Sequence, residues 1–173
     1  MYRVRQFFGA LTARTDKQDE QTLTPVLTLS QQDLFRRMPT NDQRHSLNVC
    51  RTLRQAGHTE GTPEGKALLA AALLHDVGKS QGRIWLWHRV AIVLLERWAP
   101  RALDRLSSGK PQGWRQGFVV HRQHPEVGAQ WAERAGCSPL TVTLIRRHQE
   151  PLDETLCEEN QLLAALQQAD GMN

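Results

Sequence analysis

An adjacent histidine and aspartate stand at the end of a purely apolar run in this sequence. Residues 67–74 are all alanine or leucine, and His75, Asp76 and then Lys79 follow them. Such a run predicts a buried helix, where an uncompensated carboxylate would cost much free energy. The imidazole and the carboxylate place a nitrogen and an oxygen ligand side by side. We therefore expect a metal cation at this point of the chain.

Length and composition indicate a single domain, and the cysteines indicate a reducing compartment such as the cytoplasm. A chain of 173 residues can bury a sizeable core without disulfides. Its three cysteines are odd in number and widely spaced, so neither a disulfide framework nor a zinc ribbon is expected. No apolar segment of signal-peptide type precedes Arg14. We therefore expect a cytoplasmic location.

The net charge of +4 has two interpretations. Of the 22 basic residues, 18 are arginine, and arginine suits bidentate recognition of phosphate. An anionic substrate and a simple compositional bias of the genome explain this equally well. No lysine-rich run or ladder of aromatic residues accompanies the charge, so nucleic acid is not expected as a partner.

The chain divides into a lead-in and a domain. Residues 14–27 are rich in Gln, Thr and Asp, lack periodicity and contain Pro25, which indicates irregular structure. We expect residues 1–28 to form an irregular N-terminal lead-in and residues 29–173 to form one domain.

The most apolar stretch, residues 84–95, is too short to cross a membrane. A span needs about 20 apolar residues, and His88 interrupts this stretch. It is interpreted as a buried helix, and no membrane is expected as a partner. Trp85, Trp87 and Trp98 are then expected in the core, with a dimer contact as the alternative.

Helix signals recur along the domain, and no segment alternates as a strand does. Thr62 before Pro63 and Ser138 before Pro139 each place an N-cap before a proline at the first helical position. With the apolar periodicity, these signals predict an all-α fold, a single compact helical bundle. The expected helices cover residues 39–57, 62–76, 84–98, 101–106, 125–136, 138–148 and 158–169.

Several polar residues share a helix face with apolar side chains. His45, for example, has Val49 and Leu53 on its face. One histidine on such a face is usually a core residue whose ring nitrogens are hydrogen-bonded. A whole set of buried polar side chains would need a separate hydrogen-bond partner for each member. A shared metal centre satisfies the set together. Its members are His45, His75, Asp76, His124, His148 and Asp170.

Three other histidines are weighed against this set. His88 has no neighbouring carboxylate in the sequence and is interpreted as a core or supporting residue. His121 lies three residues before His124 and could replace it as a ligand, but Pro125 is expected to start the helix only after both. We favour His124. His58 follows a C-capping glycine and is expected to be solvated.

The ordered set resembles the HD-domain superfamily of metal-dependent phosphohydrolases. It is most similar to the HDIG branch, whose HDIGK motif appears here as residues 75–79, HDVGK. The resemblance covers about residues 42–171. In that family the His–Asp pair, the first histidine and the last aspartate bind one metal, and two further histidines bind a second. The resemblance therefore implies a binuclear site at His45, His75, Asp76, His124, His148 and Asp170, with Asp76 bridging the ions.

Two ions of this kind would supply the chemistry of phosphate ester hydrolysis. They lower the pKa of a bridging water, and the resulting metal-bridging hydroxide becomes the nucleophile. We expect Asp76 and Lys79 to be catalytic and Arg44 and Lys79 to contact the substrate phosphate. The structural alternative for Lys79 is a surface lysine near a helix end. The mixed nitrogen and oxygen ligands suit two divalent transition-metal ions, Mn, Fe, Co, Ni or Zn.

The stretches around His124 and His148 also resemble HD-GYP proteins, which hydrolyse cyclic di-GMP. The chain lacks their second adjacent histidine and their Asp-Gly-x-Gly-Tyr-Pro loop, because Gln149, Glu150 and Pro151 follow His148. A third metal ion is therefore not expected. We expect hydrolysis of a phosphorylated small molecule of the nucleotide or cyclic dinucleotide class. The alternative is a non-catalytic HD sensory or adaptor module that binds metal or nucleotide.

Overall fold

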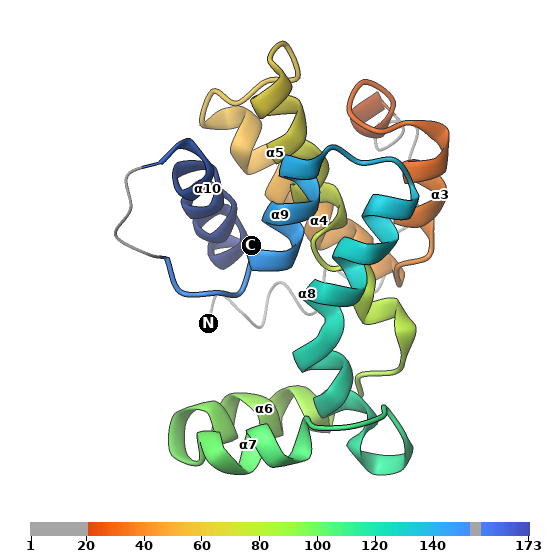
Figure 1. Cartoon of the computed structure of the whole chain (residues 1–173), viewed down its shortest axis with the longest axis vertical. Coiled ribbons are helices and arrows are strands. Elements are labelled where there is room, and N and C mark those ends of the chain that lie inside the picture. Colours follow the sequence, from red (N-terminus) through yellow and green to blue (C-terminus); the bar gives the residue numbers. More distant parts are fainter. Residues whose placement is uncertain (1–20, 153–156) are drawn as a thin grey trace.

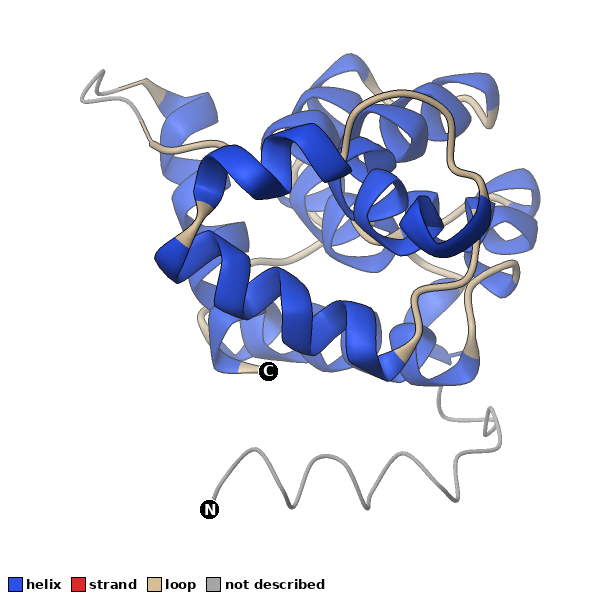
Figure 2. Cartoon of the chain, turned by 90° about the horizontal axis from the view of Figure 1, so that it is seen from below, coloured by secondary structure: helices blue, strands red, loops and turns tan. Residues whose placement is uncertain are grey.

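The computed structural model describes residues 21–152 and 157–173, and all regular structure in these ranges is helical. The predicted all-α fold is thereby confirmed (Figure 2). Within these residues, no helix is both long enough and apolar enough to cross a bilayer. Most of the expected lead-in, residues 1–20, lies outside the described part. Leu23, Val26 and Leu27, which also belong to the expected lead-in, are buried in the main core.

Helix α5 (Pro63–Leu74) is the centre of the bundle. Nine of its twelve residues are buried, so it is covered on nearly every side. Its start follows the expected signals, because the Thr62 side chain accepts a hydrogen bond from the Gly65 backbone N–H at 3.0 Å and Pro63 is the first helical residue. The helix ends at His75, which is its C-cap. The apolar helix thus delivers His75 and Asp76 to the interior.

Four helices surround α5 and carry the other polar residues of the predicted set. Helices α4 (Thr40–Gln55), α9 (Pro139–Arg147) and α10 (Glu158–Met172) contact α5 directly. Helix α8 (Gln116–Arg134) packs on α9 (Figure 1). Helix α3 (Leu29–Arg36) adds Leu34 and Phe35 to the core. Segments far apart in the sequence therefore converge at the C-terminal end of α5.

The expected start of the helix at Pro125 is wrong. Helix α8 begins at Gln116 and continues through Pro125, so His121 and His124 lie on one helix. Proline cannot donate a backbone hydrogen bond, which leaves the His121 carbonyl without its usual helical donor. The His124 Nδ1 atom occupies that position, 2.6 Å from the His121 oxygen. A side chain thus compensates for the proline within the helix.

A short 3₁₀ helix, η2 (Val77–Gln81), lies against α8 with almost no space between the two backbones. A Cβ atom on Gly78 would lie 2.1 Å from the His124 carbonyl oxygen and 2.8 Å from the Gly128 backbone nitrogen. Only glycine permits this approach. The close contact of Gly78 with α8 therefore brings Asp76 and Lys79 near His124.

The expectation that residues 84–95 form a buried helix is also wrong. Helix α6 (Leu86–Trp98) and helix α7 (Pro100–Leu106) form a hairpin at the end of α8 that lies away from α5 and α10 (Figure 1). A small separate core of Ile92, Leu103 and Phe118 holds the hairpin to α8. Most of the apolar side chains of α6 face outward. The exposed ones include Trp85, Trp87 and Trp98, which were expected in the core.

Candidate metal centre

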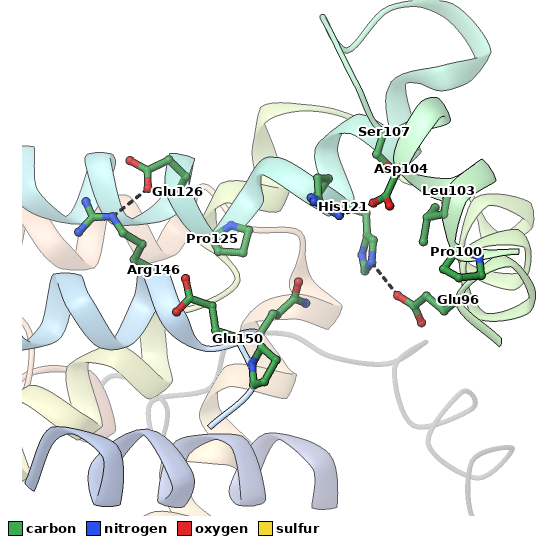
Figure 3. A pocket seen from close by; sticks show the side chains of 13 residues that line it. Glu96, Pro100, Leu103, Asp104, Ser107, His121, Pro125, Glu126, Arg146 and Glu150 are labelled. Carbon is green, nitrogen blue, oxygen red and sulfur yellow. Dashed lines mark hydrogen bonds and ion pairs between the residues drawn. The ribbon is translucent and has the colours of Figure 1, made fainter. Parts of the chain in front are cut away.

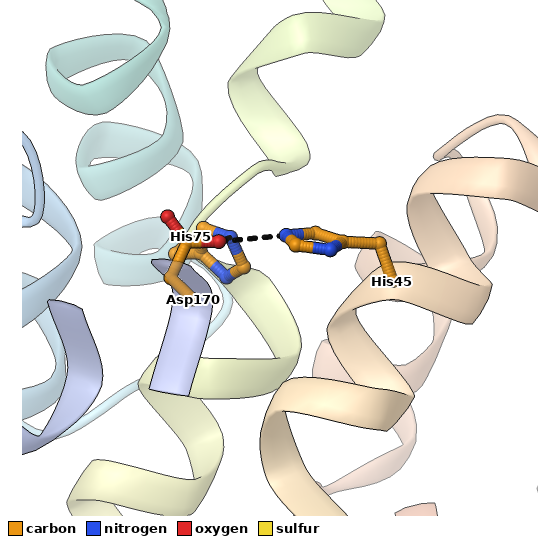
Figure 4. Close-up of side chains that lie close together, drawn as sticks. All are labelled: His45, His75 and Asp170. Atoms are coloured by element: carbon orange, nitrogen blue, oxygen red, sulfur yellow. Dashed lines mark hydrogen bonds and ion pairs between the residues drawn. The ribbon is translucent and has the colours of Figure 1, made fainter. Parts of the chain in front are cut away.

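Three of the predicted ligands, from α4, the end of α5 and α10, meet in a first group. The Nε2 atom of His45 lies 2.7 Å from the Oδ1 atom of Asp170, and Nε2 of His75 lies 3.5 Å from the same oxygen (Figure 4). One ligand atom from each residue falls within 4.8 Å of the others. His75 is fully buried, while His45 and Asp170 are about one third exposed. This geometry can hold one metal ion at the edge of the core.

The other three predicted ligands form a second, fully buried group. Asp76, His124 and His148 also have one ligand atom each within 4.8 Å of one another. The Oδ1 atom of Asp76 lies 3.5 Å from Nε2 of His124 and 3.9 Å from Nε2 of His148. The two imidazole Nε2 atoms are 3.2 Å apart. The six predicted residues are therefore brought together as two adjacent triads.

Asp76 lies between the two triads and faces both. Its Oδ1 atom points to His124 and His148, while its Oδ2 atom lies 3.6 Å from Nε2 of His75. Oδ2 also accepts a hydrogen bond from the Lys79 ammonium at 2.6 Å. The two oxygens of one carboxylate thus address two neighbouring ligand groups.

Three of the four histidine rings are oriented in the same way. The Nδ1 atoms of His75, His124 and His148 lie 2.9, 2.6 and 2.7 Å from the carbonyl oxygen three residues earlier in the chain. A carbonyl can only accept, so Nδ1 carries the proton in each case and donates it. His75 and His148 are the C-caps of α5 and α9, where carbonyls lack helical donors, and Pro125 creates the same condition for His124. Each ring consequently directs Nε2 into the triads.

The donor atoms of these triads fit a cation. The His75 Nε2 atom is buried and has no hydrogen-bond partner. The neutral rings of His124 and His148 would present lone pairs to each other across 3.2 Å, because both protons reside on Nδ1. Facing lone pairs repel, and a buried polar atom without a partner costs about 1–3 kcal/mol. A metal ion in each triad would satisfy these atoms.

Electrostatics of the residues themselves favour anionic carboxylates and a neutral His148. Burial raises the pKa of Asp76, but the positive charges of His75 and Lys79 outweigh this effect and hold it well below its usual range. The hydrogen bond from His45 and the charge of the nearby His75 ring likewise overcome burial and lower the pKa of Asp170. Burial and the neighbouring rings lower the pKa of His148 to about 3. Deprotonated carboxylates and neutral imidazole are the forms that bind metals.

The pKa of His75 is raised, whereas that of His148 is lowered. Burial disfavours the charged ring, but the carboxylates of Asp76 and Asp170 outweigh burial and raise the pKa. The ring therefore attracts positive charge at Nε2, either a proton or a cation.

The remaining candidates lie outside the triads. His121 faces the Glu96 carboxylate, with Nε2 3.2 Å from Oε1, and therefore differs in environment from His124 (Figure 3). His88 is buried and bonded at both nitrogens, to the Trp85 backbone N–H and the Trp114 carbonyl, which confirms it as a core residue. Arg44 is half-buried beside His45 on α4.

A pocket of about 680 Å³ is lined by sequence neighbours of His124 and His148, but by none of the six triad residues. Its wall includes residues that flank the two ligand histidines in the sequence, namely His121, Pro125, Gln149 and Glu150. The opposite wall comes from α6 and α7, through residues such as Glu96 and Asp104. Sequence reasoning missed this pocket because residues 84–95 were expected to form a buried helix. Glu96, which directly follows the apolar run of α6, was the available signal.

Comparison with protein families matches residues 43–170 to the HD domain, which is about three quarters of the chain. No curated protein and no solved structure matches the chain. The family match covers all six residues of the two triads, from His45 to Asp170. The chain therefore belongs to the HD-domain family, a superfamily of metal-dependent phosphohydrolases.

Proposed function

We propose that this protein hydrolyses a phosphate ester with two divalent cations, one in each triad, and that Asp76 bridges them. The position of Asp76 carries the proposal. One buried carboxylate directs Oδ1 to His124 and His148 and Oδ2 to His75. A carboxylate that served only a structural ion pair would need a partner on one of its two oxygens, not ligand groups at both.

The bound cations would lower the pKa of a shared water and neutralise the charge that develops on the phosphoryl oxygens. The protein residues would contribute positioning. Carbonyl hydrogen bonds fix the rings of His75, His124 and His148, so their Nε2 atoms need no reorganisation. Lys79, which is partly exposed beside Asp76, would bind a phosphoryl oxygen and offset its negative charge.

The proposed substrate is a nucleotide or cyclic dinucleotide. The pocket of about 680 Å³ has the size of a small-molecule site, and residues next to His124 and His148 in the sequence line it. Two arginines in the pocket wall form ion pairs, Arg122 with Asp104 and Arg146 with Glu126. A substrate phosphate could replace either carboxylate as the partner of the guanidinium group. Arg44 remains a proposed phosphate contact on the side of the first triad.

Hydrolysis of a generic phosphodiester and a nucleotide panel, with protein loaded with Mn or Fe, tests the proposal. His124→Ala should lose activity and one ion, whereas His121→Ala, on the same helix outside the triads, should retain both ions. His75→Ala and Asp76→Ala should lose activity and metal. Metal bound normally without any turnover would contradict the catalytic proposal and support a sensory or adaptor module.

A further inference from the structure

The outer face of α6 is apolar and uncovered in the described part of the chain. Its large apolar side chains are more than two fifths exposed, and Trp98 reaches 74%. Trp114, on the short 3₁₀ helix η3 (Gly113–Arg115) that precedes α8, is 62% exposed. Four of the five tryptophans of the chain are therefore at the surface of this one region. The exposed α6 residues, with Trp85 just before the helix, are Trp85, Leu86, Trp87, Val90, Val93, Leu94 and Trp98.

This exposed face is distinct from the face that α6 buries. His88 and Ile92, four residues apart, are both buried: His88 contacts Trp114 and Phe118, and Ile92 belongs to the small core with Leu103 and Phe118. Leu86, Val90 and Val93 recur at intervals of three or four on the opposite side. The helix is thus apolar on two sides, which a hairpin packed only on α8 does not require. A contiguous apolar patch of this kind marks an interaction surface.

Positive charge is concentrated around the same face. Residues 83–115 contain seven basic and two acidic side chains, a net charge of +5, while the whole chain carries +4. Arg83, Arg89, Arg97, Arg101 and Lys110 are exposed. The rest of the chain is therefore nearly neutral, and the basic excess of the protein lies on the hairpin and the segments that flank it.

The two acidic residues of the hairpin do not cancel this charge at the apolar face. Glu96 pairs with His121, and Asp104 pairs with Arg122, both on α8, and both carboxylates line the pocket of about 680 Å³ (Figure 3). Arg97, in contrast, follows Val93 by four residues and so lies at the end of the apolar row. The apolar face therefore has a basic border.

We infer that α6 docks on the surface of an anionic lipid bilayer. Tryptophan is enriched at bilayer interfaces, and helices with one apolar face and a basic border lie in the interface plane. Arginine side chains can extend from such a helix to lipid phosphates. A second copy of this chain fits less well, because a twofold interface would bring its basic borders together. Docking at the surface needs no spanning helix, so it revises the expectation that a membrane is not a partner.

Vesicle binding by the full-length protein tests this inference. The protein should sediment with phosphatidylcholine vesicles that contain phosphatidylglycerol, and less with vesicles of phosphatidylcholine alone. Because Trp85, Trp87 and Trp98 would enter an apolar environment, tryptophan emission should shift to the blue on binding, and brominated lipids should quench it. Added salt should weaken the association.

Two double variants separate the apolar and the basic contributions. Val90→Glu with Val93→Glu should abolish sedimentation, and Arg97→Glu with Arg101→Glu should weaken partitioning by more than about tenfold. All four side chains are exposed, so the fold should persist, as circular dichroism can verify. The matched controls, which should bind as the unmodified protein does, are Leu29→Glu on α3 and Arg37→Glu with Arg134→Glu.

Three results would overturn the inference. The first is an unmodified protein that stays in the supernatant with anionic vesicles at low salt. The second is equal sedimentation of the Val90/Val93 variant and its Leu29 control. The third is a dimer that the Val90/Val93 substitutions dissociate, in a protein that does not bind lipid, because a second copy would then cover the face.

Discussion

Replacement of Gly78 by alanine should disturb both the fold and the metal centre. The added Cβ atom would lie 2.1 Å from the His124 carbonyl oxygen and 2.8 Å from the Gly128 nitrogen. Both are backbone atoms inside α8, so no side chain can turn away. Helix η2 must therefore move off α8 by about 1 Å to restore van der Waals contact.

The cost follows from this displacement. Overpacking of a close-packed site costs about 1–3 kcal/mol, and for a chain of this length each kcal/mol lowers the melting temperature by roughly 2–4 °C. We therefore expect a decrease of about 2–12 °C for Gly78→Ala. Asp76 precedes η2 directly, and metal ligands tolerate displacements of only about 0.2 Å. Metal affinity should fall by at least about tenfold.

Thermal unfolding by circular dichroism and metal titration measure these effects in a graded series. Gly128→Ala, whose Cβ would meet its neighbours at 3.3–3.4 Å, should cost less. Gly61→Ala, with its nearest neighbour at 3.5 Å, should have no effect. A Gly78→Ala protein that melts and binds metal like Gly61→Ala would refute the close contact between η2 and α8.

Three further substitutions or measurements probe other parts of the account. Lys79→Ala should retain metal but lower kcat by about 10- to 1000-fold, since it removes a positive charge beside the phosphoryl oxygens. Pro125→Ala should raise the melting temperature but weaken metal binding roughly tenfold, because a new backbone N–H competes with His124 for the His121 carbonyl. Burial raises the Cys50 pKa to about 11, so the folded state keeps a proton that the unfolded state loses, and stability should decline as pH rises from about 9 to 11. This decline should become smaller in Cys50→Ala, and the partly buried Cys137 thiol, whose pKa is also about 11, should account for part of what remains.

The sequence was sufficient for the residues of the two triads because helix phase and caps are local properties. Thr62–Pro63 and Ser138–Pro139 start α5 and α9 where their signals predict. The 3.6-residue period then places His75 and His148 at the buried ends of these helices. Phase identifies the face of a helix but not the distance between helices. The family resemblance, and not helix phase, implied two ligand groups with Asp76 between them, and the distances within each triad required the structure.

The errors arose where tertiary contacts override local signals. Pro125 usually marks a helix start, but the His124 side chain takes the carbonyl that proline leaves without a donor, and α8 continues. The sequence of helix α6 predicts a core helix because the helix is apolar on both sides. Composition alone cannot distinguish a buried face from an exposed binding face. The exposure of Trp85, Trp87 and Trp98 therefore could not be predicted from their sequence.

Anomalous diffraction from crystals grown with Mn²⁺ tests the central claim most directly. Two peaks should appear on either side of the Asp76 carboxylate, one near His45, His75 and Asp170 and the other near His124 and His148. In Asp76→Asn both peaks should weaken or disappear, since the bridging charge is lost. A single peak, or peaks away from Asp76, would contradict the proposed binuclear centre.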